Sequence, residues 1–375
     1  MKIHQITWSA QSGWTGGPSP TKADWVLYFG DTASLAGQDA WPALRAAFPQ
    51  ALLTGCSTGT YIQNVDLRDQ GVAAVAITLE KASLRLASVD VDGGEGSRIW
   101  GRTLAERLAS PDLVGVFVLS DGLRVNGSEL VAGLAEILGD TVAVVGGLAG
   151  DGAAFVRTLV GADAAPRESV IAAIGFYGKG LTLRQGSAHG WDFFGPPRRV
   201  TKATGAVLEA LDGRPPLELY ERYLGDEAED LPGSALLYPL LLQDPKKIDT
   251  DMIRTVLSVD RDGGAMTFAG DIPEGWTARL MRGAFGRLIA GAGEAANQAR
   301  GVDGPPELAI AVSCVGRRLL MGQRAMDEIA AVAEAFETTP LLGFYSYGEI
   351  GARRKGGASG LHNQTMTVVT LREDG

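Results

Sequence analysis

One block of segments recurs three times along this chain, and the repetition limits the possible fold more than any other feature. In each block an apolar strand ends in a small or polar turn, and a short amphipathic helix follows. A strand interrupted by glycine comes next, and then another apolar strand. Strand, helix and strand in this order are typical of α/β proteins. We therefore predict an α/β fold with mixed sheets, in which repeated strand–helix–strand units form a layered sandwich of two related halves.

The glycine interruption falls at the same place in each block, which argues for a shared architecture. The first strand, glycine strand and last strand span 25–31, 51–59 and 72–79 in the first block, 113–122, 142–152 and 169–178 in the second, and 308–314, 341–350 and 365–371 in the third. The turns at 55–58, 146–151 and 344–349 are thus predicted to end corresponding strands. Ligands of open α/β sheets bind at such strand ends.

Helix signals are clearest in the first two blocks. Trp41, Leu44 and Phe48 share one helical face, which predicts a helix near 39–48. Asn126 followed by Glu129 resembles a capping box, which predicts a helix from there through residue 138.

Residues between the second and third blocks follow another pattern. A helix is expected at 215–224 after Pro-Pro, strands at 235–242, 253–260 and 266–275, and a helix at 285–299. The turn-forming run at 213–216 marks the predicted boundary, so we expect two domains, 1–213 and 214–375.

Composition restricts the classes of partner and the compartment. A net charge of −10 and a pI of about 5.0 argue against binding to nucleic acid or anionic membrane. No apolar run has the length of a membrane span, and the first residues lack the apolar core of a signal peptide. Two cysteines and no CxxC fit reduced thiols. We expect a cytoplasmic protein without membrane insertion, metal site or nucleic-acid partner.

Polar and aromatic residues concentrate at the strand ends of the third block. The segments are SCVGRR at 313–318, GFYSYGEI at 343–350 and LHNQT at 361–365. A ligand site needs a few placed polar groups in a mostly apolar wall. The candidate ligand-binding residues here and at the equivalent turns are Cys56, Ser57, Thr58, Asp151, Cys314, Arg317, Tyr345, Tyr347, Glu349, His362 and Asn363.

Their chemistry suits a zwitterion of the amino-acid type. Arg317 or Arg318 could bind a carboxylate through a bidentate pair of hydrogen bonds, and Glu349 could bind an amine. Alternation along a strand would direct Tyr345, Tyr347 and Glu349 to one face. The alternatives are a half-exposed strand with aromatic outer positions and, for the arginines, a solvated turn.

The motifs of this chain, in this order, resemble those of the FIST family of bacterial sensory domains. Similarity to the amino-terminal FIST domain rests on GCSTG at 55–59 and on the run ending at 213. Similarity to the carboxy-terminal FIST domain rests on the motifs at 216–226, 231–240 and 268–275 and on the three polar segments described above. The resemblance implies a non-enzymatic ligand sensor, with small molecules such as amino acids as signals. It also implies output through a partner protein such as a kinase, cyclase or chemoreceptor.

Two other functions stay open at this point. Some FIST members are haem-dependent nitric oxide sensors, and His189 or His362 could supply the axial ligand. A cysteine-dependent hydrolase or transferase would need Cys56 or Cys314 as a thiolate with a base in reach. The backbone N–H groups around Cys56 could instead hold an anion, or the turn could simply require small residues.

Overall fold

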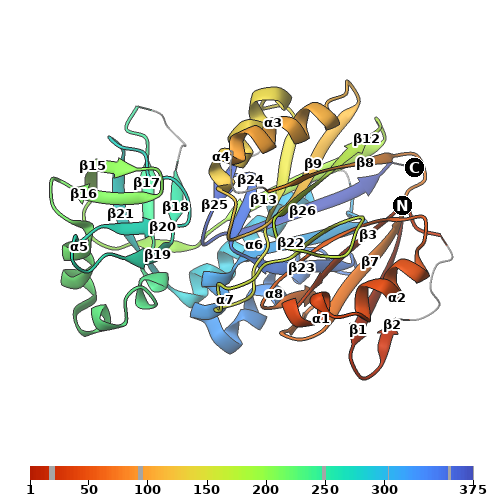
Figure 1. The fold of residues 1–375 in the computed structure, drawn as a ribbon, viewed down its shortest axis with the longest axis horizontal. Helices are drawn as coiled ribbons and strands as arrows, with labels where there is room; N and C mark the ends of the chain where they lie inside the picture. Colours follow the sequence, from red (N-terminus) through yellow and green to blue (C-terminus); the bar gives the residue numbers. More distant parts are fainter. Residues whose placement is uncertain (17–21, 92–95, 247–250, 303, 354–355, 375) are drawn as a thin grey trace.

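Three six-stranded sheets form the body of the protein, and a smaller lobe projects from it (Figure 1). The computed structural model describes residues 1–16, 22–91, 96–246, 251–302, 304–353 and 356–374. In spatial order, the first sheet contains β11 (Val160–Ala162), β4 (Leu52–Ser57), β3 (Trp25–Gly30), β7 (Val72–Thr78), β1 (Lys2–Ser9) and β2 (Gly13–Thr15). The second contains β25 (Ser359–His362), β24 (Gly348–Ala352), β10 (Ala143–Leu148), β9 (Leu113–Ser120), β12 (Val170–Tyr177) and β8 (Ser83–Asp90). The third contains β13 (Leu181–Ala188), β26 (Met366–Glu373), β22 (Leu308–Cys314), β23 (Leu341–Ser346), β5 (Tyr61–Gln63) and β6 (Asp66–Arg68).

The predicted repeat is present, because the three sheets are built alike. In each, the first strand of the unit runs parallel to the glycine strand and antiparallel to the third strand. One glycine of each glycine strand lies at the same register position. Gly55 is opposite Tyr28, Gly146 is opposite Val118, and Gly343 is opposite Ala311. A Cβ at Gly55, Gly146 or Gly343 would lie 2.1, 1.9 or 2.2 Å from the carbonyl oxygen of that partner. The close approach of the two strands therefore requires glycine in every unit, which explains the periodic sequence signal.

The units exchange strands, which the sequence did not reveal. After each glycine strand the chain leaves its own sheet: β5 joins the third sheet, β11 the first and β24 the second. The crossing segments meet near the middle of the molecule. There the Gly150 N–H donates to the Ser57 carbonyl at 3.0 Å, the Tyr347 N–H to the Leu148 carbonyl at 3.1 Å, and the Thr58 hydroxyl to the Tyr345 carbonyl at 2.8 Å.

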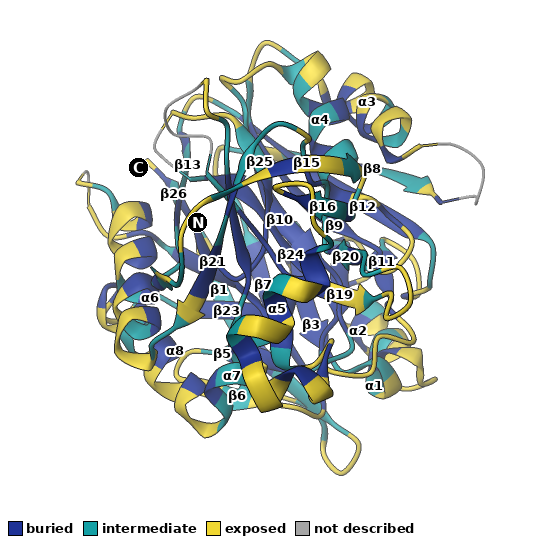
Figure 2. Cartoon of the chain, turned by 90° about the vertical axis from the view of Figure 1, so that its left-hand side faces the viewer, coloured by how far each residue is buried: buried dark blue, intermediate teal, exposed yellow. Residues whose placement is uncertain are grey.

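A single apolar core fills the space between the three sheets. Residues from all of them, such as Phe29, Phe117 and Phe344, pack into this core. The outer faces are covered by helices: α1 (Thr32–Ala36) and α2 (Ala40–Ala47) on the first sheet, α3 (Ser97–Leu108) and α4 (Gly127–Leu138) on the second, and α6 (Phe285–Arg300), α7 (Val315–Met321) and α8 (Ala325–Glu334) beside the third. Figure 2 shows the central strands buried and the exposed residues concentrated on the outer helices and loops. The expected mixed α/β architecture in layers is confirmed.

The lobe is formed by the segment between the second and third units. Its strands, in spatial order, are β18 (Met252–Arg254), β17 (Leu240–Gln243), β21 (Thr277–Gly283), β15 (Arg198–Thr204), β16 (Val207–Leu211), β20 (Met266–Phe268) and β19 (Val256–Val259), with β14 (Trp191–Phe193) beside β21. The helix α5 (Pro216–Leu224) and the 3₁₀ turns Gly225–Asp230 and Ser234–Leu237 complete it, and a third 3₁₀ turn, Gly322–Arg324, follows α7 in the body. The predicted domain boundary after residue 213 lies within this lobe, between β16 and α5.

Local sequence signals were reliable for the helices. Those expected at 39–48, 215–224 and 285–299 are α2, α5 and α6, and Asn126 caps α4. The expected single strand through Tyr345, Tyr347 and Glu349 is wrong, because β23 ends at Ser346 and β24 begins at Gly348 in a different sheet. In the part of the chain that the structure describes, no helix has both the length and the apolar character to cross a membrane.

Candidate functional site

A cavity of about 420 Å³ lies between the lobe and the body. The lobe wall comes mainly from Thr255 before β19, from β19 and β20, and from the loop after β20. The body wall comes from the loop after β9, the start of α7 and the segments around β25. Most of the lining is apolar, as in typical small-molecule pockets. The lining residues are Gly122, Leu123, Arg124, Val125, Asn126, Gly127, Leu148, Phe155, Ala206, Leu236, Thr255, Leu257, Thr267, Phe268, Ala269, Gly270, Cys314, Val315, Gly316, Tyr347, Leu361 and Asn363.

Two buried polar atoms of the lining lack a hydrogen-bond partner, one on each wall. Thr255, 5% exposed, belongs to the lobe, and Asn363, 1% exposed, to the body. Neither the Thr255 Oγ1 nor the Asn363 Oδ1 has a partner among the described residues. The Asn363 amide nitrogen makes one long contact, 3.5 Å from the Tyr347 carbonyl oxygen. Buried polar atoms are nearly always satisfied in folded proteins, so each of these two lining residues has capacity for one further hydrogen-bond partner.

The amino terminus of α4 forms another part of the wall and connects it to the lobe. The Asn126 Oδ1 accepts from the N–H groups of Ser128 and Glu129 at 3.0 and 3.2 Å. Its amide nitrogen donates to the Asp271 carboxylate of the lobe at 3.0 Å. The helix dipole contributes a positive partial charge at this end of the cavity, next to the Asp271 carboxylate.

The loop 151–157 covers one side of the cavity through an aromatic pair. The Phe155 ring lines the cavity and stacks on Tyr347, with centroids 4.5 Å apart. The Tyr347 hydroxyl donates to the Asp151 carboxylate, which also accepts from the N–H groups of Phe155, Val156 and Arg157 at 2.7–2.9 Å. Burial raises the pKa of Tyr347, and the neighbouring carboxylate acts in the same direction. Asp151 and Tyr347 therefore hold the covering loop.

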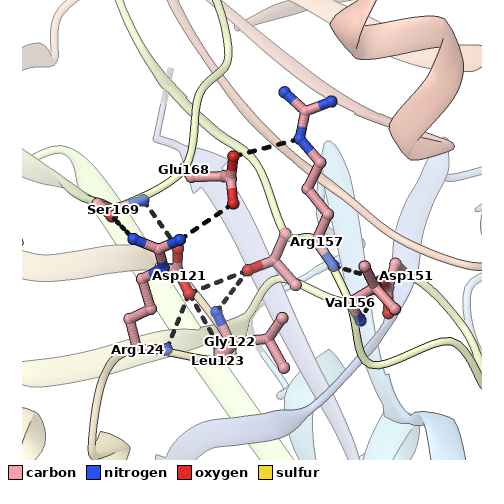
Figure 3. Close-up of polar contacts among 10 residues, drawn as sticks. Asp121, Gly122, Leu123, Arg124, Asp151, Val156, Arg157, Glu168 and Ser169 are labelled. Carbon is pink, nitrogen blue, oxygen red and sulfur yellow. Dashed lines mark hydrogen bonds and ion pairs between the residues drawn. The ribbon is translucent and has the colours of Figure 1, made fainter.

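A second carboxylate shapes the neighbouring loop after β9 (Figure 3). The Asp121 Oδ1 accepts from the N–H groups of Leu123 and Arg124 at 2.8 and 3.0 Å, and its Oδ2 from the Ser169 N–H at 2.8 Å. The Arg124 and Arg157 side chains, each about half exposed, both pair with Glu168 at 3.3 Å. These contacts fix the rim of the cavity.

Arg317, the predicted carboxylate-binding residue, is engaged elsewhere. Its guanidinium and the Glu328 carboxylate are both fully buried, with an N–O distance of 2.5 Å. The same carboxylate accepts from Ser313 at 3.0 Å and from the Tyr345 hydroxyl at 3.3 Å. Arg318 donates to the Thr60 hydroxyl at 3.2 Å and lies 3.5 Å from Asp69. Neither arginine lines the cavity, and Tyr345 belongs to the Arg317–Glu328 network.

Glu349 is a buried carboxyl group with neutral partners. It accepts from the Ser346 hydroxyl at 2.6 Å and from the Thr365 N–H and hydroxyl at 3.1 and 2.9 Å. Burial raises its pKa to about 8 despite these hydrogen bonds. The group lies behind the cavity wall and does not line it.

The two cysteines differ in position but share one property. Cys314 lines the cavity, whereas Cys56 lies in the core between the sheets. Burial raises the pKa of both thiols above the ordinary value. A neutral thiol is a poor nucleophile, so neither environment is that of a reactive cysteine.

The histidines proposed as haem ligands lie outside the cavity lining. The His362 Nε2 is 3.0 Å from the Gly351 carbonyl oxygen, and the His189 Nδ1 accepts from the Trp191 N–H at 3.0 Å. Burial lowers the pKa of His362 to about 3 and that of His189 to about 4. The cavity thus offers haem no histidine ligand. Among the described residues, no group of three or more His, Cys, Asp or Glu side chains could hold a metal ion.

The turn after β4 has its hydrogen bonds satisfied within the protein. The Ser57 hydroxyl accepts from the Leu159 N–H at 2.8 Å, and the Thr58 hydroxyl is bonded to the Thr60 and Tyr345 backbone. Of the predicted residues, only Cys314, Tyr347 and Asn363 line the cavity, with Asp151 one contact away. The lobe wall, including Thr255, was not found from the sequence, because that residue lies in an ordinary strand-like run.

Comparisons with known proteins place the chain among its relatives. Family models described as the FIST N domain and the FIST C domain match residues 24–214 and 216–352. Two uncharacterized proteins from two strains of Mycobacterium tuberculosis are 28% identical over 184 residues, 47% of this chain. The match likewise spans 47% of those proteins, so the chain covers about half the length of the curated relatives it matches. A crystal structure of cyanuric acid hydrolase from A. caulinodans aligns over 99% of this chain and 98% of its own, at 9% identity and a TM-score of 0.39, a similarity too weak to support an inference.

Proposed function

Since this chain belongs to the FIST family, we propose that it is a sensor whose small-molecule ligand binds in the cavity between the lobe and the body. The family is associated with signal transduction and small-ligand sensing. The ligand we propose is an amino acid or a related carboxylate. A volume of about 420 Å³ is large enough to admit a molecule of that size.

The observation that carries this proposal is the pair of unsatisfied polar atoms on opposite walls. The Thr255 hydroxyl can donate to a ligand carboxylate, and the Asn363 Oδ1 can accept from an amine. Leaving such atoms unpaired costs about 1–3 kcal/mol each, and a ligand that bonds to both removes that cost. The apolar remainder of the lining suits a hydrocarbon side chain.

A ligand held by both walls offers a direct route to signalling. It would bind more tightly to the arrangement in which lobe and body are close, and would shift the population toward it. We propose that a partner protein, such as a kinase, cyclase or chemoreceptor, reads this change in the cytoplasm. Cysteine-dependent catalysis is not part of the proposal, because burial raises the pKa of both thiols.

Calorimetry with the twenty amino acids and their simple carboxylate analogues tests the proposal. Binding should be lost or weakened about tenfold in Asn363→Ala, the cost expected for one buried hydrogen bond. Asn297→Ala, which changes an exposed asparagine of α6, is the matched control and should bind as the parent protein does. A flat response from folded protein across the whole set would overturn the proposal, as would equal binding by the two variants.

A further inference from the structure

Arg254, at the end of β18, is a buried cation that makes no ion pair with any described residue. It is 1% exposed, and no ion pair joins it to a carboxylate of the described residues. All five of its N–H groups are used on neutral acceptors. These are the carbonyl oxygens of Asp271, Ile253 and Leu361 at 3.1–3.2 Å, the Ser128 hydroxyl at 3.4 Å and the Met252 sulfur at 3.2 Å.

The contrast with Arg317 shows how unusual this is. Both side chains are among the largest that are fully buried. Arg317 faces the Glu328 carboxylate at 2.5 Å. Buried charges in proteins are normally paired, because an isolated one loses its hydration without compensation. Burial accordingly lowers the pKa of Arg254 to about 10, and only the charge of Asp271 acts against this.

The unpaired guanidinium lies directly behind the ligand cavity. A Cβ at Gly270 would lie 2.9 Å from the Arg254 Nε, so glycine there lets the cavity wall approach the cation. Gly270, Leu361 and Thr255 all line the cavity. The first two are in contact with Arg254 or bonded to it, and Thr255 is its chain neighbour. The charge therefore lies next to residues that line the cavity.

We propose that Arg254, which makes no ion pair with the described residues, renders this cavity selective for anionic ligands, whose carboxylate supplies a counter-charge. This role rests on the proposed function, and it makes Arg254 the group that distinguishes a charged ligand from a neutral one. Arg254 is a positioning residue, since its N–H groups are already bonded. It acts through its field at short range in a poorly hydrated site, where charges interact more strongly than in water. The positive end of α4 acts in the same direction.

Matched acid and amide probes measure this selectivity directly. We would titrate the protein with 4-methylpentanoate and 4-methylpentanamide, benzoate and benzamide, and L-leucine and L-leucinamide. Acids should bind at least about tenfold more tightly than the corresponding amides, as expected for one charge interaction in such an environment. Arg254→Gln should bring this ratio close to one, whereas Arg254→Lys, which keeps the charge, should retain most of it.

Arg279→Gln is the control variant. Arg279 is a partly buried arginine of the same lobe whose guanidinium donates to the Gly195 carbonyl oxygen at 2.8 Å, and it does not line the cavity. This change should leave the acid-to-amide ratio unaltered. A purely structural role for Arg254 would weaken acid and amide alike in both the Gln and Lys variants, without changing the ratio.

The outcomes separate the two proposals. If probes bind but the parent protein shows no preference for acids, or if Arg254→Gln keeps the preference, the role of Arg254 is refuted and the ligand site stands. The preference of the parent protein for acids over amides can be measured without any variant, so this test remains available even if Arg254→Gln fails to fold. If none of the probes or amino acids binds to folded protein, both proposals fail together.

Discussion

Replacing Thr255 by valine should stabilise the unliganded protein while weakening ligand binding. Thr255 is 5% exposed and its buried hydroxyl has no partner among the described residues, so the folded protein bears the cost of the hydration that the hydroxyl loses. That cost is about 1–3 kcal/mol, and valine removes it while keeping a similar shape. With about 2.1 cal/mol/K of unfolding entropy per residue, 375 residues give about 0.8 kcal/mol/K. The melting temperature should therefore rise by roughly 1–4 °C.

Urea unfolding of Thr370→Val provides the matched comparison. Thr370 is 2% exposed, but its hydroxyl donates to the Ala299 carbonyl oxygen at 2.8 Å. Valine there leaves a buried carbonyl unpaired and should lower the free energy of unfolding by about 1–3 kcal/mol. The two Thr→Val changes are thus expected to have opposite signs. If Thr255→Val destabilises the protein as Thr370→Val does, its hydroxyl is satisfied, and the main support for the ligand site disappears.

Three further changes test other parts of the structure. Arg317→Met should lower the free energy of unfolding by about 3–5 kcal/mol, because it leaves the Glu328 carboxylate buried and unpaired; a loss below 1 kcal/mol in urea unfolding would contradict the buried pair. Burial raises the pKa of Glu349 to about 8 from 4.5, so the folded protein keeps a proton that the unfolded chain releases. Between those pH values this group should reduce stability by about 1.4 kcal/mol per pH unit as pH rises. In unfolding curves measured for both proteins across this pH range, Glu349→Gln should remove that slope. An identical pH dependence of stability in the two proteins would rule out the raised pKa of Glu349. Tyr347→Phe releases the loop 151–157 from the hydroxyl, and hydrogen exchange should become faster in that loop but not in β9.

The repeated architecture was predictable because a local steric requirement produces it. Each glycine strand runs so close to its parallel neighbour that a Cβ would overlap a carbonyl oxygen, and so the sequence carries glycine at the same place three times. Helix positions were predictable for similar reasons, since caps and apolar spacing are local. Asn126, for example, both precedes α4 in the sequence and caps it in the structure.

The candidate site was harder to predict, because its parts meet only through long-range topology. Periodicity along 344–349 suggested one strand, but the chain changes sheets at Tyr347. Arg317 looked available for a ligand, and the helix that supplies its partner, Glu328, gave no sign of that pairing in the sequence. Thr255, the chain neighbour of Arg254, lines the cavity because the whole lobe folds against the body, and nothing in the local sequence of these two residues distinguishes them from residues of other strand-like runs.

The position of the cavity is related to a difference among the three units. Register places Asp31, Asp121 and Cys314 at one equivalent point, which directly follows the first strand in the first two units and is the last residue of that strand in the third. The two carboxylates accept backbone N–H groups of the following turn and of the segment before the third strand. The third unit has a neutral thiol at this point, and that thiol lines the cavity. Because an aspartate there would place a negative charge at the cavity wall, its replacement by cysteine is compatible with an anionic ligand beside Arg254. This difference among the units is thus compatible with the ligand class proposed from Arg254.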